Sequence, residues 1–105
     1  MHIQIVNFNL KGVSEEDYKK LCDELSQAFA DMPGLISKVW LANPATNTYG
    51  GVYTWRDRQA MEAFTQTELF KAVANHPNLE NITSSDFGVL EGPTQVTRGL
   101  VEARV

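Results

Sequence analysis

The sequence predicts an α+β fold of the ferredoxin-like type, a split β-α-β arrangement built on an antiparallel sheet. Strand-like and helix-like patterns follow in the order strand, helix, strand, strand, helix, strand, which is the order of that fold. Each helical segment gathers its apolar residues on one side, so both helices can pack on one face of the sheet. The chain has 105 residues, which fits one domain. We expect this domain to span residues 1–93, with a C-terminal tail at 94–105.

The first strand and the first helix have clear signals. Residues 2–10 (HIQIVNFNL) are rich in Ile, Val and Phe, as strands are, and the apolar residues change face within the segment, so a bulge or two covered faces is expected. Ser14 can cap the helix that follows, and three acidic residues occupy its first turn. Pro33-Gly34 ends it. Its apolar stripe consists of Tyr18, Leu21, Cys22, Leu25, Phe29 and Met32.

Residues 35–41 and 48–55 predict two strands of an antiparallel hairpin, joined by a turn at 43–47. The second of these strands contains Gly50-Gly51. Two adjacent glycines weaken a strand, so they indicate a bulge or the close approach of another group.

The second helical region begins at Asp57, a capping residue, and ends at Asn75-His76-Pro77. Its apolar repeat changes phase at residues 65–67, which predicts a kink or two short helices. Residues 79–91 predict the fourth strand, and Gly92-Pro93 ends it.

An antiparallel sheet with both helices on one face leaves its other face open in a monomer. Tyr49, Tyr53 and Trp55 share one side of their strand, and a contiguous aromatic patch is typical of an interface or a ligand site. We therefore expect a homodimer in which two sheets pack together and the tail at 94–105 reaches across the partner.

Composition excludes several classes of protein. A net charge of −4 and a pI near 5.0 argue against nucleic acid or an anionic membrane as partner. No run of about 18 apolar residues is present to span a bilayer. The N-terminus lacks the basic start and apolar stretch of a signal peptide, so we expect a cytoplasmic protein.

The sequence gives no sign of a cofactor. His2, Cys22 and His76 lie far apart, without the spacing of metal ligands. Gly50-Gly51 lies inside a strand and is not a phosphate-binding loop. We therefore expect no metal and no cofactor.

Two polar residues are candidates for catalysis. Asn7 on the first strand could contact a ligand carbonyl or a developing oxyanion, or it could bond a neighbouring strand or helix. His76 could act as a general base toward a phenolic proton, or it could cap the negative end of a helix. Cys22, on an apolar helix stripe, is expected to be a buried, inert thiol.

Trp40 and Tyr53 have two interpretations of similar weight. They could pack in the sheet or dimer core, or they could form a pocket wall that stacks on a planar substrate. Lys38, a polar neighbour on the same side of the strand as Trp40, keeps the pocket interpretation open.

Three short motifs resemble the YdhR-like monooxygenase family: Lys38-Val39-Trp40 after Pro33-Gly34, the Gly50-Gly51-Val52-Tyr53 strand, and the Asn75-His76-Pro77 helix end. The resemblance extends along nearly the whole chain, including Gly92-Pro93-Thr94. This family is part of the dimeric α/β-barrel superfamily, which includes the antibiotic-biosynthesis monooxygenases. The resemblance implies a homodimer whose sheets form a barrel, with a ligand pocket between sheet and helices.

The resemblance also implies chemistry. Some relatives oxidise phenolic or anthrone-type substrates with dioxygen and without metal or flavin. Others degrade heme with an asparagine on the first strand, a tryptophan on the second helix and a histidine near its end. Asn7 could match the asparagine, but Phe64 and Ala74 occupy the places of the other two. His76 comes two residues later, on roughly the opposite side of a helix, so the chain departs from the heme-degrading pattern.

The first hypothesis is a cofactor-independent monooxygenase that oxidises a small aromatic or polycyclic substrate. Asn7 or His76 would assist deprotonation, and the pocket would be lined by Trp40, Tyr53, Phe64, Phe70 and Phe87. One alternative is a non-catalytic dimeric protein that binds a small ligand or is related to stress. Another is an isomerase that uses a single base.

Overall fold

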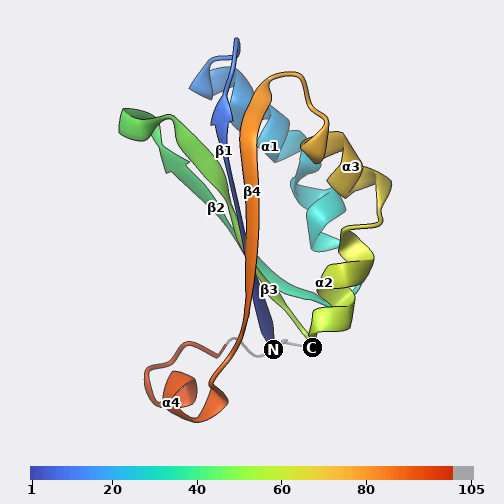
Figure 1. Cartoon of the computed structure of the whole chain (residues 1–105), viewed down its shortest axis with the longest axis vertical. Coiled ribbons are helices and arrows are strands. Elements are labelled where there is room, and N and C mark those ends of the chain that lie inside the picture. The colour runs from blue at the N-terminus through green and yellow to red at the C-terminus, as the bar shows by residue number, and fades with distance from the viewer. Residues whose placement is uncertain (101–105) are drawn as a thin grey trace.

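The computed structural model describes residues 1–100, which form a four-stranded antiparallel sheet with helices packed on one side (Figure 1). The predicted ferredoxin-like α+β fold is confirmed. In chain order the elements are β1 (His2–Leu10), α1 (Glu15–Ala30), β2 (Leu35–Asn43), a 3-10 turn (Pro44–Thr46), β3 (Thr48–Trp55), α2 (Arg58–Phe64), α3 (Glu68–Ala74), β4 (Leu79–Gly88) and α4 (Glu91–Val96).

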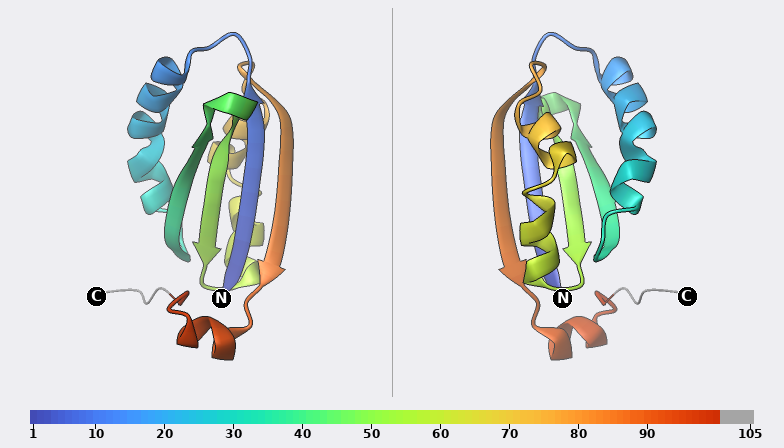
Figure 2. Two further views of the ribbon diagram at one scale, coloured as in Figure 1. Left: turned by 90° about the vertical axis from the view of Figure 1, so that its left-hand side faces the viewer. Right: turned by 90° about the vertical axis from the view of Figure 1, so that its right-hand side faces the viewer.

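The strands lie in the order β2-β3-β1-β4, and every neighbouring pair is antiparallel. Helices α1, α2 and α3 cover one face, and no element of the described chain covers the other face (Figure 2). In β1 the residues at even positions are buried toward the helices, and the odd positions are half-buried on the bare face. The pairing of β1 with β4 shifts register between Asn7 and Asn9, where β4 advances three residues, from Thr83 to Glu80, against two of β1. The extra residue therefore lies in β4, and β1 itself alternates without the bulge that was one of its two predicted explanations.

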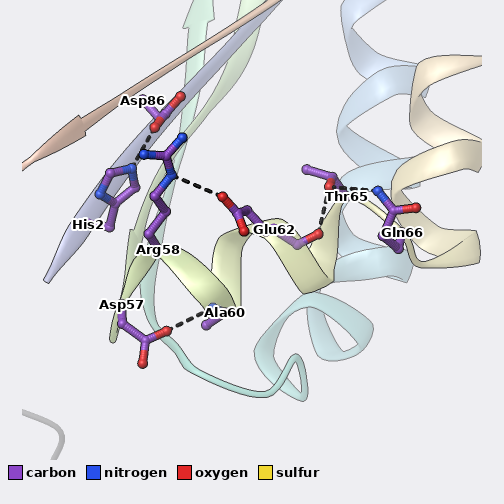
Figure 3. Close-up of polar contacts among 8 residues, drawn as sticks. All are labelled: His2, Asp57, Arg58, Ala60, Glu62, Thr65, Gln66 and Asp86. Carbon is purple, nitrogen blue, oxygen red and sulfur yellow. Dashed lines mark hydrogen bonds and ion pairs between the residues drawn. The ribbon is translucent and has the colours of Figure 1, made fainter.

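Side-chain caps fix where the helices begin. The Ser14 hydroxyl accepts a hydrogen bond from the Asp17 N–H at 3.1 Å, and Asp57 accepts one from the Ala60 N–H at 2.8 Å (Figure 3). Thr67 caps α3 in the same way, which confirms that the phase break separates two short helices. Both short helices therefore pack independently against the sheet.

A polar network crosses the core at the end of the sheet where β1 begins. The Trp55 indole N–H donates to the Gln4 amide oxygen at 3.1 Å, and the Gln4 amide nitrogen donates to the Ser84 hydroxyl at 3.2 Å. Trp55 is 0% exposed, so this N–H needs an internal partner. Beside the network, His2 Nε2 lies 2.6 Å from an Asp86 carboxylate oxygen (Figure 3). These contacts tie β1 to β3 and β4.

The aromatic patch of β3 faces the helices. Tyr49, Tyr53 and Trp55 are all buried in the core of the single chain, where Phe64 of α2 packs on Tyr53 and Trp55. The idea that these rings lie on an open interface is therefore wrong. The bare face of the sheet carries other apolar residues, among them Val39 at 58% exposed and Phe87 at 54%.

The C-terminal segment contains a helix that the sequence did not reveal. β4 ends at Gly88, three residues before the predicted end at 91, so Gly92-Pro93 does not end the strand as expected. These two residues lie instead in the first turn of α4, where proline is tolerated because its missing N–H has no helical partner. The predicted boundary between residues 93 and 94 therefore falls inside α4. Residues 101–105 of the predicted tail lie outside the described residues. None of the described helices is long and apolar enough to cross a membrane.

Candidate functional site

A cavity of about 180 Å³ lies between the sheet and helices α1 and α3. It is somewhat larger than the ~150 Å³ cavity that holds benzene in an engineered protein core. A one-ring aromatic molecule therefore fits, and a larger one would extend through the opening. Most of the wall is aliphatic or aromatic and includes Phe8, Tyr18, Leu25, Leu69, Val73 and Leu79.

A second hollow of about 400 Å³ adjoins this cavity along α1 and β2. Tyr18, Cys22 and Trp40 line both spaces. The second hollow is more polar, because Glu15 and Lys19 stand at its edge. A fused-ring molecule could therefore place one ring in the apolar cavity and extend the next toward this hollow.

Lys38 brings an amine into the apolar cavity. It lies on β2 two residues before Trp40, and alternate residues of a strand point to the same face. Its Nζ atom is 3.3 Å from the centre of the Trp40 ring, 3.4 Å from that of Phe29 and 4.8 Å from that of Tyr53. Aromatic faces attract cations, so these rings hold the end of the side chain in place and replace part of the water contact that an ammonium would have outside the cavity.

Gly51 of β3 provides the space that the Lys38 side chain occupies. A Cβ atom at position 51 would lie 2.8 Å from Lys38 Cε, well inside the usual 3.5–4.0 Å packing distance of carbon atoms. The neighbouring Gly50 has φ +151°, and a Cβ there would collide with the Val6 carbonyl oxygen. The close approach expected at the two glycines is therefore present: the Lys38 side chain approaches Gly51, and the Val6 backbone approaches Gly50.

Burial lowers the pKa of Lys38 to about 7, because the ammonium loses contact with water. The Cys22 thiol opposes this shift more weakly. Among residues 1–100 no carboxylate lies within ion-pair distance of Lys38. A substantial fraction of the amine is therefore neutral at neutral pH and able to accept a proton.

The other titratable groups on the α1 and β3 walls are weak acids. Burial raises the pKa of the Tyr18 and Tyr53 hydroxyls, and the hydrogen bond with Cys22 raises that of Tyr18 further. Burial also raises the pKa of the Cys22 thiol. All three groups stay protonated at neutral pH, and a protonated thiol is a poor nucleophile. Cys22 was expected to be a buried thiol, but it is only half-buried and lines both spaces.

Trp40 and Tyr53 both line the cavity and both pack in the core. Trp40 meets Phe29 edge-on with ring centres 5.3 Å apart. Tyr53 stacks on Trp55, with ring centres 5.9 Å apart and planes within 4° of parallel. The two interpretations of these residues are therefore compatible, because packing on one side of each ring orients the side that faces the cavity.

His76 also lines the cavity. α3 ends at Ala74 and Asn75 caps it, so the helical repeat that put His76 on the other side of the helix does not extend to this residue. Its Nδ1 accepts a hydrogen bond from the Asn78 N–H at 3.1 Å. A neutral imidazole that accepts at Nδ1 carries its proton on Nε2, so this hydrogen bond leaves the Nε2–H of His76 as a donor for a ligand.

Phe64 and Phe70 lie behind the cavity wall. Phe64 is 3% exposed and packs against Tyr53 at 5.5 Å and Phe29 at 5.9 Å between ring centres. Phe70 meets Phe64 edge-on at 5.3 Å. Neither ring lines the cavity itself, so both support residues that do.

The structure does not bring Asn7 and Phe87 to the cavity. Asn7 is at an odd position of β1, so its side chain lies on the bare face of the sheet, opposite the helices. Phe87 pairs with Ile3 across the β1–β4 ladder and lies on the same bare face. The prediction that both residues line one pocket with Trp40 is therefore wrong. Successive residues of a strand point to opposite faces of the sheet, and these two side chains lie on the face away from the helices.

Lys38 is the residue that sequence reasoning passed over as a functional group. Its place two residues before Trp40 was visible in the sequence, and so was a glycine pair in the adjacent strand. What was missing was the register, which sets Gly51 opposite Trp40. Within residues 1–100 no three His, Cys, Asp or Glu side chains gather closely enough to hold a metal ion.

The sequence matches the protein family described as "Putative mono-oxygenase ydhR" over residues 3–100. It has no significant match among curated proteins. The fold is similar to that of the heme degrader MhuD from Mycobacterium tuberculosis, solved with two hemes in its active site. That similarity has a TM-score of 0.68 at 18% identity and covers 86% of this chain and 96% of the other.

The fold is also similar to SnoaB, a cofactor-independent oxygenase from Streptomyces nogalater. The TM-score is 0.66 at 17% identity, and the match covers 86% of this chain and 94% of the other. At these identities the two structures establish the shared fold.

Proposed function

The chain belongs to the ydhR mono-oxygenase family, and from that premise we propose that it oxidises a small planar aromatic substrate with dioxygen in the cavity beside Lys38. The observation that carries the proposal is the combination of an apolar, aromatic-walled cavity with one amine and one imidazole facing it. Such a cavity favours a flat, largely apolar molecule with a single ionisable or polar edge.

The chemistry suits a substrate that becomes electron-rich when it loses a proton. The anion of an anthrone-type molecule can pass one electron to dioxygen, and the resulting carbon radical and superoxide combine into a carbon–oxygen bond. Loss of water from the peroxide then leaves a carbonyl. One oxygen atom ends in the product and the other in water, and the substrate supplies all the electrons and both hydrogens. This stoichiometry requires no resident cofactor, as in the oxygenase SnoaB.

The cavity residues would have distinct tasks. Trp40 and Tyr53 would stack against the substrate plane, because their rings form its walls and are themselves fixed by packing. His76 would donate a hydrogen bond from Nε2 to a substrate oxygen, since its Nδ1 is already an acceptor. Together these contacts would select the orientation in which the ionisable edge lies near the amine.

Oxygen uptake in the presence of an anthrone tests the proposal. Wild-type protein should raise the rate well above the spontaneous rate, Trp40→Phe should keep most of the increase, and Trp40→Ala should lose at least tenfold. An uptake equal to the spontaneous rate, with the bound aromatic recovered unchanged, would support the ligand-binding alternative. Solvent proton exchange into the substrate without oxygen uptake would support the isomerase.

We also propose that two copies pack through the bare face of the sheet. Ile3, Ile5, Val39, Val52 and Phe87 form an apolar surface there, and Val39 and Phe87 are more than half exposed in the single chain. Leu90, which precedes α4, is 79% exposed, and Val96, the last residue of α4, is 78% exposed. Exposed apolar residues on this helix, at one end of the sheet, suit a segment that lies on a partner (Figure 1). Packing a second copy there would complete the burial of the sheet.

A further inference from the structure

We propose that Lys38 is the general base of the cavity: its neutral amine takes the proton of a phenolic or enolic substrate, and the ammonium formed holds the resulting oxyanion. This assignment rests on the proposed function, since it names the substrate class and the proton acceptor for the same cavity. It begins from geometry. Lys38 is the amine that lines the cavity, and three aromatic rings and Gly51 fix its position.

Of the ionisable groups around the cavity, the Lys38 amine is the one suited to accept a proton. Helix α1 contributes the Tyr18 hydroxyl and the Cys22 thiol, and β3 contributes the Tyr53 hydroxyl. The pKa of each group is raised, so each holds its proton more firmly than usual. From the turn after α3 comes His76, whose Nδ1 is occupied by the Asn78 N–H. The carboxylate of Glu15 stands at the neighbouring hollow and accepts from the Tyr49 hydroxyl.

The charge balance of the step suits an apolar cavity. A neutral amine and a neutral O–H become an ammonium and an oxyanion in contact, so the cavity takes up no net charge. A lone phenolate would be strongly disfavoured there, because burial without a counter-ion penalises the charged form. The faces of Trp40 and Phe29 would stabilise the ammonium once it forms.

The Lys38 amine can accept a proton even before a substrate binds. The pKa of Lys38 is lowered to about 7 by burial, so near pH 8 most molecules carry a neutral amine at this position. A lysine side chain in full contact with water would be protonated at the same pH and could not accept a proton. The cavity therefore favours weakly acidic planar molecules over aromatic hydrocarbons and over aromatic cations.

The test uses meta-nitrophenol without oxygen, at a pH above the pKa of Lys38 and below that of the free phenol. The anion of this probe absorbs at longer wavelength than the neutral form, so absorbance reports whether the bound phenol is ionised. Calorimetry in buffers of different ionisation enthalpy counts the protons released on binding. Lys38→Met removes the amine, Lys38→Arg keeps a cation that cannot accept a proton, and Lys20→Met is the matched control.

Wild type and Lys20→Met should bind the phenol as its anion with almost no proton released. Lys38→Arg should bind the anion and release about one proton per site, and Lys38→Met should bind the neutral phenol or bind at least tenfold more weakly. Absence of the anion band in wild type, or equal bands in wild type and Lys38→Met, overturns the assignment. So does release of a full proton by wild type.

The two proposals fail separately. An anion band in wild type without any protein-dependent oxygen uptake from an anthrone would overturn the oxygenase function and leave Lys38 as the proton acceptor. Undiminished oxygen uptake by a folded Lys38→Met variant would overturn the role of Lys38 and leave the oxygenase function intact. Circular dichroism of each variant establishes that it is folded before the assays.

Discussion

The Lys38 Nζ atom lies 3.3 Å from the centre of the Trp40 ring, inside a cavity and on the face of the sheet that the helices cover. An amine in this position is half-buried among rings, without a carboxylate partner in residues 1–100. Structural cores rarely keep such a group, because a buried charge without an ion pair costs stability. This unpaired position supports the proposed role of Lys38 as a proton acceptor.

The first prediction concerns the pH dependence of stability. Lys38 has a folded-state pKa of about 7 and an ordinary value of 10.5, so between these pH values the unfolded chain binds more protons than the folded chain. Its destabilising effect is complete below pH 7 and fades as the pH rises toward 10. Lys38→Met should therefore be more stable than wild type by about 2 kcal/mol at pH 6, after discounting for solvent contact.

Urea unfolding of both proteins at several pH values measures this difference. The advantage of Lys38→Met should shrink steadily between pH 7 and 9. Lys20→Met, which alters an exposed lysine on α1, should differ from wild type by a constant amount over the same range. A constant difference for Lys38→Met as well would contradict the shifted pKa.

The second prediction concerns Gly51. A methyl group in Gly51→Ala would lie 2.8 Å from Lys38 Cε and would push this flexible side chain away from the rings. Stability should change by less than about 1 kcal/mol, because alanine also lowers the entropy of the unfolded chain. The wild-type anion band of bound meta-nitrophenol should weaken severalfold. A band of wild-type intensity would show that the position of the amine does not depend on Gly51.

The third prediction concerns the core network. Gln4→Ala leaves the Trp55 N–H without its acceptor and opens a void at a fully buried position, so the free energy of unfolding should fall by about 3 kcal/mol. Thermal or urea denaturation measures this loss. Gln66→Ala, at an exposed position beyond α2, should change stability by less than about 0.5 kcal/mol. Equal effects of the two changes would refute the role of the network.

The fourth prediction concerns association. Val39→Lys with Phe87→Lys places two charges on the bare face of the sheet and should convert a dimer into a monomer in analytical ultracentrifugation. Gln27→Lys adds a charge on the exposed side of α1 and should leave the dimer intact. A wild-type protein that is monomeric at micromolar concentration would remove the basis of the proposal.

The sequence was sufficient for the fold because its elements carry local signals. The caps at Ser14 and Asp57, the stripe that includes Tyr18 and Phe29, and the phase break near Thr67 all have the structural consequences expected of them. α4 was missed because Gly92-Pro93 is a strand-ending signal that also suits the first turn of a helix.

The site was harder to predict, because it depends on which face of each strand meets the helices. The structure places Trp40 and Tyr53 at the cavity wall, and it places Asn7 and Phe87 on the opposite side of the sheet from the one to which they were assigned. Strand alternation fixes which residues share a side, and only helix packing decides which side is covered. The position of Lys38 in the cavity could be recognised only from the strand register, because the register places its side chain beside Gly51 and Trp40.

The oxygenase proposal is tested most directly by the fate of isotopically labelled dioxygen during turnover of an anthrone. Mass spectrometry should find one labelled oxygen atom in the new carbonyl of the product, formed at a protein-dependent rate that falls at least tenfold in Trp40→Ala. The other labelled atom should appear in water. Product formed only at the spontaneous rate, with or without the protein, would contradict the proposed function.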